Sequence, residues 1–584
     1  MKVRWGILQL IFMLPLSYGW VWECDTKSNS CYRKRRLTSS DSFYENVDIC
    51  RLACDPKGNI WPQPSNLSVT NHDLVYIAVQ CSVLSWSAPS EKSSAFLEEI
   101  VGYFKDVVNL NEHNGCYGYI LVINLIAASP SLLLNWETNE AYQLTISTNN
   151  SLQTVEVNIV ADSVYGVRHG VETLLQLIPS LDSGDDIFYV TLKGLSIEDK
   201  PRFKHRGLLL DSARNYLSLD VIKKNIVAMG MSKMNVLHWH ISDTQSFPFI
   251  SKTLPNMSSY GAYSINQTYA PKQVKELLNF AKLHGVQIIP EIDGPAHAGS
   301  GWQWGPDAGL GDLVVCYNQQ PYRSYCIQPP CGQMNPANPN LYSVLTSLYS
   351  DIIDLWTESD VFHMGGDEVF VPCWNSSEEV LRYIGPNRSE EVFMDLWAEY
   401  QRKALNAYDV ANKNVTSSII LWTSTLTDPD RIVKYLPSNR YVIQTWVPKS
   451  DPLPEQLLKL GYKLIISTKD SWYLDHGFWG TTLYYNWRTV YDNTISTDSS
   501  VLGGEVCMWG ELADDNNVES KVWPRAAAAA ERLWANPSTP AINATSRFFS
   551  HNDRLARRGL RTSPLAPQFC AKSNEDCTSY ILRQ

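Results

Sequence analysis

Asp367 and Glu368 are adjacent carboxylates at the end of the apolar run Val361-Phe-His-Met-Gly-Gly-Asp-Glu368. Neighbouring acids repel each other and are costly to desolvate, so a buried strand that ends in two of them is expected to keep their protonation states apart. The alternative is a solvated Asp-Glu pair at the start of a helix. Two glycines before the pair and an aromatic residue soon after it favour the first interpretation, a reactive site.

The elements that must position this pair begin at Pro201. From there, short apolar runs alternate with amphipathic stretches, and each apolar run ends in polar or aromatic residues. Eight strand-helix units predict a (β/α)8 barrel, an α/β fold whose reacting groups gather at the carboxyl ends of the strands. Asp367 and Glu368 fall at the fourth end. The runs are Gly207–Asp211, Met234–Asp243, Val286–Asp293, Val361–Glu368, Ile419–Thr423, Tyr441–Trp446, Lys463–Thr468 and Val501–Glu511.

The other predicted strand ends supply polar and aromatic residues to the same mouth. Carboxylates, aromatic rings and one arginine, with no metal-ligand spacing and no glycine-rich phosphate loop, predict a pocket for a neutral polar ligand with ring faces. We therefore expect neither a metal nor another cofactor. The residues are Asp211, Arg214, His238, His240, Asp243, Glu291, Asp293, His297, Trp422, Trp446, Trp472, Tyr473, Asp475, Trp509 and Glu511.

The rest of the chain divides by composition. Residues 1–19 read as a signal peptide, with Lys2 and Arg4 before an apolar run that is too short to span a bilayer. Residues 20–59 are rich in cysteine, 60–200 mix strand and helix patterns as a small α+β domain, and 201–540 form the barrel. Residues 541–584 are expected to add a helix and a disulfide-closed tail packed on the barrel.

Charge and glycosylation signals narrow the partners and the compartment. A net charge of -11 argues against nucleic acid as a partner. No later segment is apolar enough to span a membrane, so we expect a secreted or lysosomal, N-glycosylated protein. Asn-x-Ser/Thr sequons begin at Asn66, Asn149, Asn256, Asn266, Asn375, Asn387, Asn414 and Asn543.

Thirteen cysteines in an oxidising compartment predict six disulfides and one free thiol. Cys50 and Cys54 are spaced to reach back to Cys24 and Cys31, in either pairing. The free thiol is expected to be Cys507, inside an apolar run. The other expected pairs are Cys81–Cys116, Cys316–Cys373, Cys326–Cys331 and Cys570–Cys577.

Four longer motifs carry a family resemblance. They are Pro201-Arg-Phe-Lys-His-Arg-Gly-Leu-Leu-Leu-Asp-Ser-Ala-Arg-Asn-Tyr216, Leu237-His-Trp-His-Ile-Ser-Asp243, His363-Met-Gly-Gly-Asp-Glu368 and Gly503-Gly-Glu-Val-Cys-Met-Trp-Gly-Glu511. Together they resemble family 20 of the glycoside hydrolases, the β-N-acetylhexosaminidases. The cysteine-rich start and Arg323-Ser-Tyr-Cys-Ile-Gln-Pro-Pro-Cys331 are most similar to the insect secreted branch. The resemblance implies an exo-acting homodimer that releases terminal β-linked GlcNAc from chito-oligosaccharides or glycoprotein glycans, and it leaves open whether GalNAc is released as well.

The family's mechanism implies roles for individual residues. In this substrate-assisted exception among retaining glycosidases, the sugar's own acetamido oxygen attacks the anomeric carbon. Glu368 would be the acid and then the base, and Asp367 would hold the acetamido N–H. His297 and Asp243 match the relay behind the acid, with a purely structural role as the alternative. Because Asp367 is close and the site is partly buried, we expect a raised pKa for Glu368.

The remaining residues would hold the sugar. Arg214 matches the residue that holds the 3- and 4-hydroxyls, with a structural ion pair to Asp211 as the alternative. The loop after Trp472 is shorter than in chitin-degrading insect relatives, which leaves the natural substrate open. By resemblance, the 4- and 6-hydroxyls would bind Asp475 and Glu511, the aromatic walls would be Trp422, Trp446 and Trp509, and the acetamido carbonyl would bind Tyr473.

Two rival functions stay open at this point. One is a catalytically silent carbohydrate-recognition protein on the same fold. The other is a barrel glycosidase of the ordinary two-carboxylate type, which acts on sugars without an acetamido group.

Overall fold

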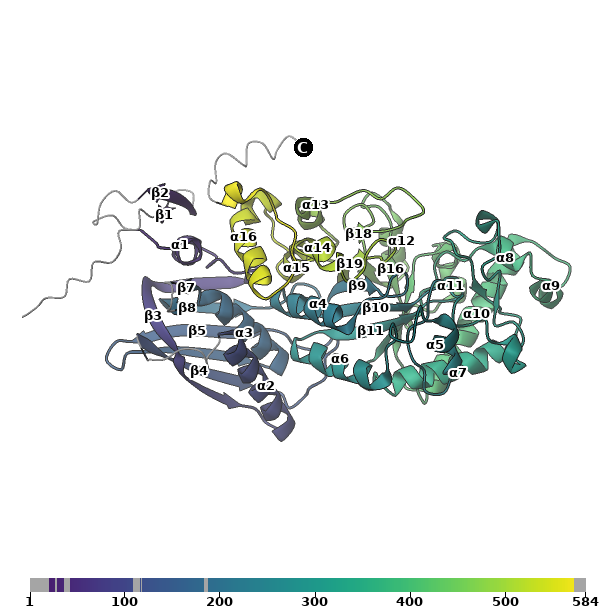
Figure 1. Ribbon diagram of the computed structural model, residues 1–584, viewed down its shortest axis with the longest axis horizontal. Helices are drawn as coiled ribbons and strands as arrows, with labels where there is room; N and C mark the ends of the chain where they lie inside the picture. The colour runs from purple at the N-terminus through teal and green to yellow at the C-terminus, as the bar shows by residue number, and fades with distance from the viewer. Residues whose placement is uncertain are drawn as a thin grey trace, which may run out of the picture.

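A computed structural model describes residues 20–571, apart from 27–28, 36–42, 109–115, 117 and 183–186. The predicted signal peptide and the Cys570–Cys577 pairing lie outside the described residues. Figure 1 shows two bodies side by side along the long axis, the N-terminal sheet in purple and blue and the barrel in teal and green.

Eight parallel strands close the barrel. Their order is β9-β10-β11-β14-β15-β16-β17-β19, and β19 pairs back with β9. Each lies within or within two residues of a predicted apolar run, and the predicted fold is confirmed. The strands are β9 (His205–Asp211), β10 (Val236–Ser242), β11 (Gln287–Ile292), β14 (Val361–His363), β15 (Ser418–Trp422), β16 (Tyr441–Thr445), β17 (Lys463–Ile466) and β19 (Val501–Met508).

The barrel strand β18 (Tyr473–Asp475) was not predicted. It pairs with the end of β19, where Tyr473 lies opposite Cys507. β18 is not one of the eight strands of the closed ring, but this pairing places its residues at the mouth of the barrel. Two short hairpin strands, β12 (Val314–Val315) and β13 (Gln333–Met334), lie in the long loop after β11.

Helices cover the outside of the barrel, as the amphipathic stretches predict. Ser218 caps α4 by accepting a hydrogen bond from the backbone N–H of Val221, and α15 is buried along all its residues. The main helices are α4 (Leu219–Met231), α6 (Pro271–Leu283), α7 (Pro339–Ile353), α10 (Glu390–Ala411) and α15 (Arg525–Trp534). Shorter ones are α5 (Asn256–Gly261), α8 (Val371–Trp374), α9 (Glu378–Ile384), α11 (Ile432–Tyr435), α12 (Leu453–Lys459), α13 (Trp487–Asp492) and α14 (Val518–Val522).

The N-terminal domain is a six-stranded sheet in the order β3-β4-β6-β5-β8-β7, with two helices packed on one face. β3 is long enough to pair with β8 in its first half and with β4 in its second. β4, β5 and β7 were not predicted, although β5 alternates buried and exposed residues along most of its length. The elements are β3 (Asn66–Ser87), α2 (Glu91–Val107), β4 (Tyr119–Ala127), β5 (Tyr142–Asn149), β6 (Thr154–Ala161), α3 (Val164–Leu177), β7 (Ser180–Asp182) and β8 (Ile187–Asp199).

The cysteine-rich segment contains β1 (Trp20–Asp25), β2 (Ser30–Arg35) and α1 (Val47–Cys54). Of the two pairings left open here, the structure has Cys24–Cys54 and Cys31–Cys50. Pairs Cys81–Cys116, Cys316–Cys373 and Cys326–Cys331 are confirmed, and Cys507 is a buried free thiol.

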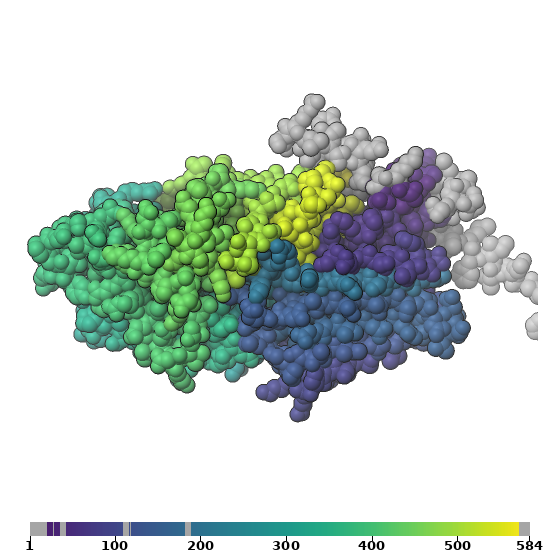
Figure 2. Space-filling view, turned by 180° about the vertical axis from the view of Figure 1, so that it is seen from behind, coloured from purple at the N-terminus to yellow at the C-terminus, as the bar shows by residue number. Residues whose placement is uncertain are grey.

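The C-terminal helix α16 (Ala541–Arg557) joins the parts of the molecule. Its Arg547 donates to the carbonyl of Ile60 at 2.9 Å, and its Ser550 accepts from Arg51 of α1 at 2.7 Å. Seen from behind, the yellow C-terminal segment lies between the green barrel and the purple start of the chain (Figure 2). Among the described residues, none of the helices has the length and apolar character needed to cross a bilayer.

Candidate active site

The turn after β14 brings both acids into one pocket. Residues that are adjacent on a strand point to opposite faces, so the chain must leave the extended conformation. It does so with φ of 65° at Gly365, 92° at Gly366 and 50° at Glu368. A Cβ atom on Gly365 would lie 1.7 Å from Asp293 Oδ1, and Gly366 N–H donates to that same oxygen at 3.0 Å. Only glycine fits this first position.

A cavity of about 120 Å³ opens at the carboxyl ends of the barrel strands. Eight of the eleven predicted site residues line it, which are Arg214, His297, Asp367, Glu368, Trp446, Tyr473, Trp509 and Glu511. Sequence reasoning missed four further lining residues as sugar-site candidates, Gln328, Lys469, His476 and Gly477.

Three predicted residues lie outside the lining. Asp243 lies behind the pocket and Trp422 beneath it, both buried. Asp475 forms an ion pair with Lys521 of α14 instead. Its predicted contact with a sugar hydroxyl stays a prediction.

His297 connects the acid to a buried carboxylate. His297 Nε2 lies 3.3 Å from Glu368 Oε2, and Nδ1 lies 3.2 Å from Asp243 Oδ1. Burial would lower the pKa of His297, but the charges of Asp243 and Asp367 raise it well above its usual value. An imidazolium is therefore held between Asp243 and Glu368.

Because of this imidazolium, the pKa of Glu368 shifts in the direction opposite to the one expected. Burial acts to raise that pKa, but the hydrogen bond with His297 and the charges of His297 and Arg214 outweigh burial, so the pKa is lowered. Our expectation of a raised pKa was wrong, because it considered burial and Asp367 but not the positive charge of His297, although the resemblance had placed His297 behind the acid. Burial instead raises the pKa of Asp367 to about 6, against the charge of His297 and with the added repulsion of Glu368.

Arg214 is fixed from two sides. Nη1 lies 3.2 Å from Asp211 Oδ2 and Nη2 lies 2.8 Å from Asp243 Oδ2, so the ion pair considered as an alternative exists alongside a place in the pocket lining. Nη2 also donates to Gln328 Oε1 at 2.6 Å, and the Gln328 amide donates to Glu511 Oε1 at 2.7 Å. Gln328 belongs to the loop closed by Cys326–Cys331, and it bridges Arg214 and Glu511, two of the three predicted hydroxyl-binding residues.

Aromatic rings form the floor and one side of the pocket. Trp422 and Trp509 lie with their ring centres 5.8 Å apart, and Tyr473 lies 6.3 Å from Trp509. Lys469 stands over the ring of Trp446 at 4.6 Å. With Leu209 and Cys507 beneath them, these rings make an apolar surface next to the acids.

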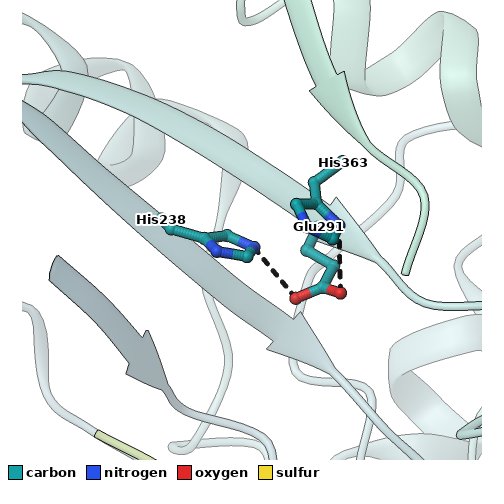
Figure 3. A group of neighbouring side chains, drawn as sticks. All are labelled: His238, Glu291 and His363. Carbon is teal, nitrogen blue, oxygen red and sulfur yellow. Dashed lines mark ion pairs between the residues drawn. The ribbon is translucent and has the colours of Figure 1, made fainter. Parts of the chain in front are cut away.

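Glu291 of β11 supports this floor from inside the barrel. Its Oε1 accepts a hydrogen bond from Trp422 Nε1 at 2.8 Å, and its Oε2 lies 2.5 Å from His240 Nδ1. Figure 3 shows His238 and His363 reaching the same carboxylate, at 2.9 and 3.1 Å.

A chain of contacts connects Glu291 to the acid Glu368. His240 Nε2 lies 2.8 Å from Asp243 Oδ2, so contacts run unbroken from Glu291 through His240, Asp243 and His297 to Glu368. His238, Glu291 and His363 are close enough to hold a metal ion. Since they pair directly with one another, we assign no metal to them.

Paired acids and aromatic walls at the mouth of a barrel are the active-site features of a glycosidase. The profile of "Glycosyl hydrolase family 20, catalytic domain" matches residues 203–537, and that of "beta-acetyl hexosaminidase like" matches residues 119–177. The chain belongs to glycosyl hydrolase family 20 and is a β-N-acetylhexosaminidase.

Relatives that match nearly the whole chain are also β-N-acetylglucosaminidases or β-hexosaminidases by name. The chain is 36% identical to the chitooligosaccharidolytic beta-N-acetylglucosaminidase of Ostrinia furnacalis, over 98% of each protein. It is 30% identical to the beta-hexosaminidase subunit beta of Homo sapiens, over 90% of this chain and 91% of that protein.

Solved structures share the fold. A chitobiase from Flavobacterium johnsoniae matches with a TM-score of 0.65 at 24% identity, over 86% of this chain and 73% of that one. The N-acetyl-β-hexosaminidase of Streptomyces plicatus matches with a TM-score of 0.63 at 20% identity, over 88% and 97%.

Proposed function

We propose that this enzyme cleaves by substrate-assisted retention, with Asp367 and Glu368 in separate roles. The substrate's acetamido oxygen attacks carbon 1 while Glu368 protonates the departing glycosidic oxygen. Glu368 then takes a proton from the water that opens the oxazolinium intermediate. Asp367 holds the acetamido N–H throughout and balances the positive charge on the intermediate.

The observation that carries this proposal is the state of Asp367. Its Oδ1 is buried and has no hydrogen-bond partner among the described residues. A buried carboxylate oxygen without a donor is costly. An acetamido N–H from the substrate supplies the missing donor, whereas a sugar without that group leaves it unpaired. This disfavours the ordinary two-carboxylate glycosidase.

The electrostatics of the free site suit the second chemical step. With its pKa lowered by His297, Glu368 is ready to act as a base. For the first step it must be protonated. A bound sugar removes water from Glu368, which favours the neutral acid, so substrate binding and protonation are coupled.

The pocket accommodates a chain end. Arg214 and Glu511, joined by Gln328, close one side, and Trp446 and Trp509 provide ring faces for the sugar. A cavity of about 120 Å³ is small, and this supports exo action on one terminal sugar. Glu511 Oε2 is also buried without a hydrogen-bond partner in the described part of the chain and would accept from a hydroxyl.

For the natural substrate, we propose oligosaccharides with terminal β-linked GlcNAc, chito-oligosaccharides included. The names of the Ostrinia furnacalis and Bombyx mori relatives support the chito-oligosaccharides. Trp479 lies on the shortened loop two residues after the pocket residue Gly477 and is half exposed, so its ring is available to a second sugar. Rates on chitobiose, on longer chito-oligomers and on a biantennary glycan measure the preference directly.

The mechanism is tested with a chromogenic GlcNAc glycoside. We expect turnover by the wild type, strong inhibition by a thiazoline that mimics the oxazolinium, and loss of turnover with retained binding in Glu368→Gln. Indifference to the thiazoline would favour the two-carboxylate mechanism. An uncut glycoside that still binds would favour a recognition protein.

We also propose a compartment and an assembly state for this enzyme. Five disulfides among the described residues suit a secreted or lysosomal protein. The homodimer rests on family resemblance, and light scattering of the purified enzyme tests it.

A further inference from the structure

The N-terminal sheet carries a solvent-exposed row of side chains outside the active site. Residues paired directly across neighbouring strands point to the same face of a sheet. The register of β3, β8, β5, β6 and β4 therefore places six exposed side chains in one line. In order they are Asn66, Glu198, Gln143, Val160, Ile126 and Ser87.

A hollow lies along one end of this row. Its volume is about 540 Å³, within the range of sites that hold small organic ligands. Asn66, Glu198, Gln143 and Val160 line it, together with Asp162 and Lys200. Glu198 is paired with Asn66, and Asp162 follows Val160 by two residues. Val160, and Ile126 just beyond the lining, leave 39% and 41% of their surface to water farther along the row.

The chemistry of this hollow suits a sugar. Amides, carboxylates and an ammonium group can bind hydroxyls, and the exposed aliphatic side chains can contact a ring face or an acetyl methyl group. Asn66 at the near end begins the sequon Asn66-Leu67-Ser68. Since residues i and i+2 of a strand share a face, the Asn66 amide and the Ser68 hydroxyl both point to the side where the hollow lies.

We propose that Asn66 carries an N-linked glycan whose first N-acetylglucosamine units lie in this hollow and extend over Val160 toward Ile126. The proposal is independent of the catalytic roles assigned above. In the secretory pathway, the Asn66 amide nitrogen displaces a lipid pyrophosphate from carbon 1 of the donor oligosaccharide. An N–C bond forms, the carbon–oxygen bond to pyrophosphate breaks, and the amide loses one proton.

A glycan seated in this way is part of the folded surface. Its inner sugars cover aliphatic surface that the protein otherwise exposes, and the linkage at Asn66 is shielded from a deglycosylating amidase. A glycan on Asn266 gives a matched control, because its sequon Asn266-Gln267-Thr268 lies in the exposed loop between α5 and α6.

The full chain, secreted from a eukaryotic host, provides the test. Glycopeptide mass spectrometry measures occupancy at Asn66 and Asn266, and a peptide amidase is then applied to native and to denatured enzyme. We expect release at Asn66 to be at least tenfold slower than at Asn266 in the native protein, and equally fast after denaturation. Val160→Ser should speed native release at Asn66 alone.

Two sequon variants separate the glycan from the asparagine itself. Asn66→Gln and Ser68→Ala both remove the glycan, so both should lower Tm by a similar amount, with activity on the chromogenic glycoside unchanged and with Asn266→Gln as the control. An unmodified Asn66, equal native release rates at the two sites, or a Tm unaffected by both variants would overturn the proposal.

Discussion

His297 and Glu368 lie 3.3 Å apart in the pocket, although they come from the loop after β11 and the turn after β14. Because Asp243 binds the other ring nitrogen, Nδ1, the imidazole is charged and held in one orientation toward Glu368. This contact, more than the neighbouring Asp367, sets the proton affinity of the acid in the free enzyme.

Replacing His297 by alanine tests whether its imidazole sets the pKa of Glu368. In His297→Ala, Glu368 loses both the hydrogen bond and the charge that lower its pKa, so the pKa should rise. The rate constant kcat should fall by about 100-fold or more, in the range for a positioned proton-transfer group. The value of kcat measures the first effect, and a pH profile of kcat/KM measures the pKa in the free enzyme. His72→Ala, in the exposed part of β3, is the control. An unchanged profile with a nearly normal rate would exclude this role.

Asp367 should cause the activity of the enzyme to fall on the acidic side of its pH profile. Its pKa of about 6 means that the carboxylate gains a proton as the pH falls through that value. The neutral acid cannot balance an oxazolinium, so kcat/KM on a GlcNAc glycoside should fall below about pH 6. In Asp367→Asn the rate should be low at all pH values and this fall should disappear. If the fall persists in the variant, another group produces it.

Glu291→Gln should destabilise the barrel in a pH-dependent way. Despite burial, Glu505 and Glu291 raise the pKa of His238 to about 9, and Glu291 and Asp243 raise that of His240. Raised histidine pKa values contribute stability that is full below about pH 6.5 and is lost as the pH rises through the folded value. The variant should therefore lose about 3 kcal/mol of unfolding free energy at pH 6, and clearly less at pH 9.

Urea unfolding at the two pH values measures this difference. His205, His363, Glu505, Asp243 and Arg214 also face this network, and the substitution leaves them in place. An equal loss at both pH values would mean that packing, and not charge, accounts for the effect.

Gly365→Ala should abolish the active geometry. The new methyl group would lie 1.7 Å from Asp293 Oδ1 at a backbone position with positive φ, so the turn that carries Asp367 and Glu368 must shift. We expect kcat to fall by about 100-fold, since small misplacements of reacting groups cost that much. Gly461→Ala is the control, because its φ of 84° is similar but nothing lies within 4 Å of the added carbon. Comparable activity in the two variants would refute the geometric explanation.

Gln328→Ala should weaken substrate binding with little effect on chemistry. Arg214 and Glu511 lose the amide that bridges them, so their side chains are less well ordered for hydroxyl binding. KM should rise by about tenfold, which is the typical contribution of one hydrogen bond to a charged group, while kcat should change little. A fall in KM would show that Gln328 obstructs the sugar instead.

Much of this architecture could be predicted because a barrel ties chemistry to strand ends. Apolar runs such as Val361–Phe362 locate the strands, and the polar residues that follow must then share one mouth. Asp367, Glu368, Arg214 and Glu511 were found in this way.

The rest depends on distances between remote segments. β18 has only three residues, too few for a periodic pattern, and its pairing with β19 is a tertiary contact. Gln328 is a neutral amide in a loop, and only the spacing of Cys326 and Cys331 hinted at an ordered loop there. The expected pKa of Glu368 was wrong for a different reason. The resemblance placed His297 behind the acid, but it did not show that His297 is charged and lies 3.3 Å from Glu368.

Trp61 makes the barrel dependent on the chain that precedes it. Its indole stacks on Phe548 with 4.4 Å between ring centres, donates to the carbonyl of Ala527 at 3.0 Å and is wholly buried in the barrel's own core. A catalytic fragment that begins at the first barrel strand would lack this wedge and leave a water-filled gap against its last helices. Shortened versions for biotechnology should therefore keep the residues upstream of the small sheet.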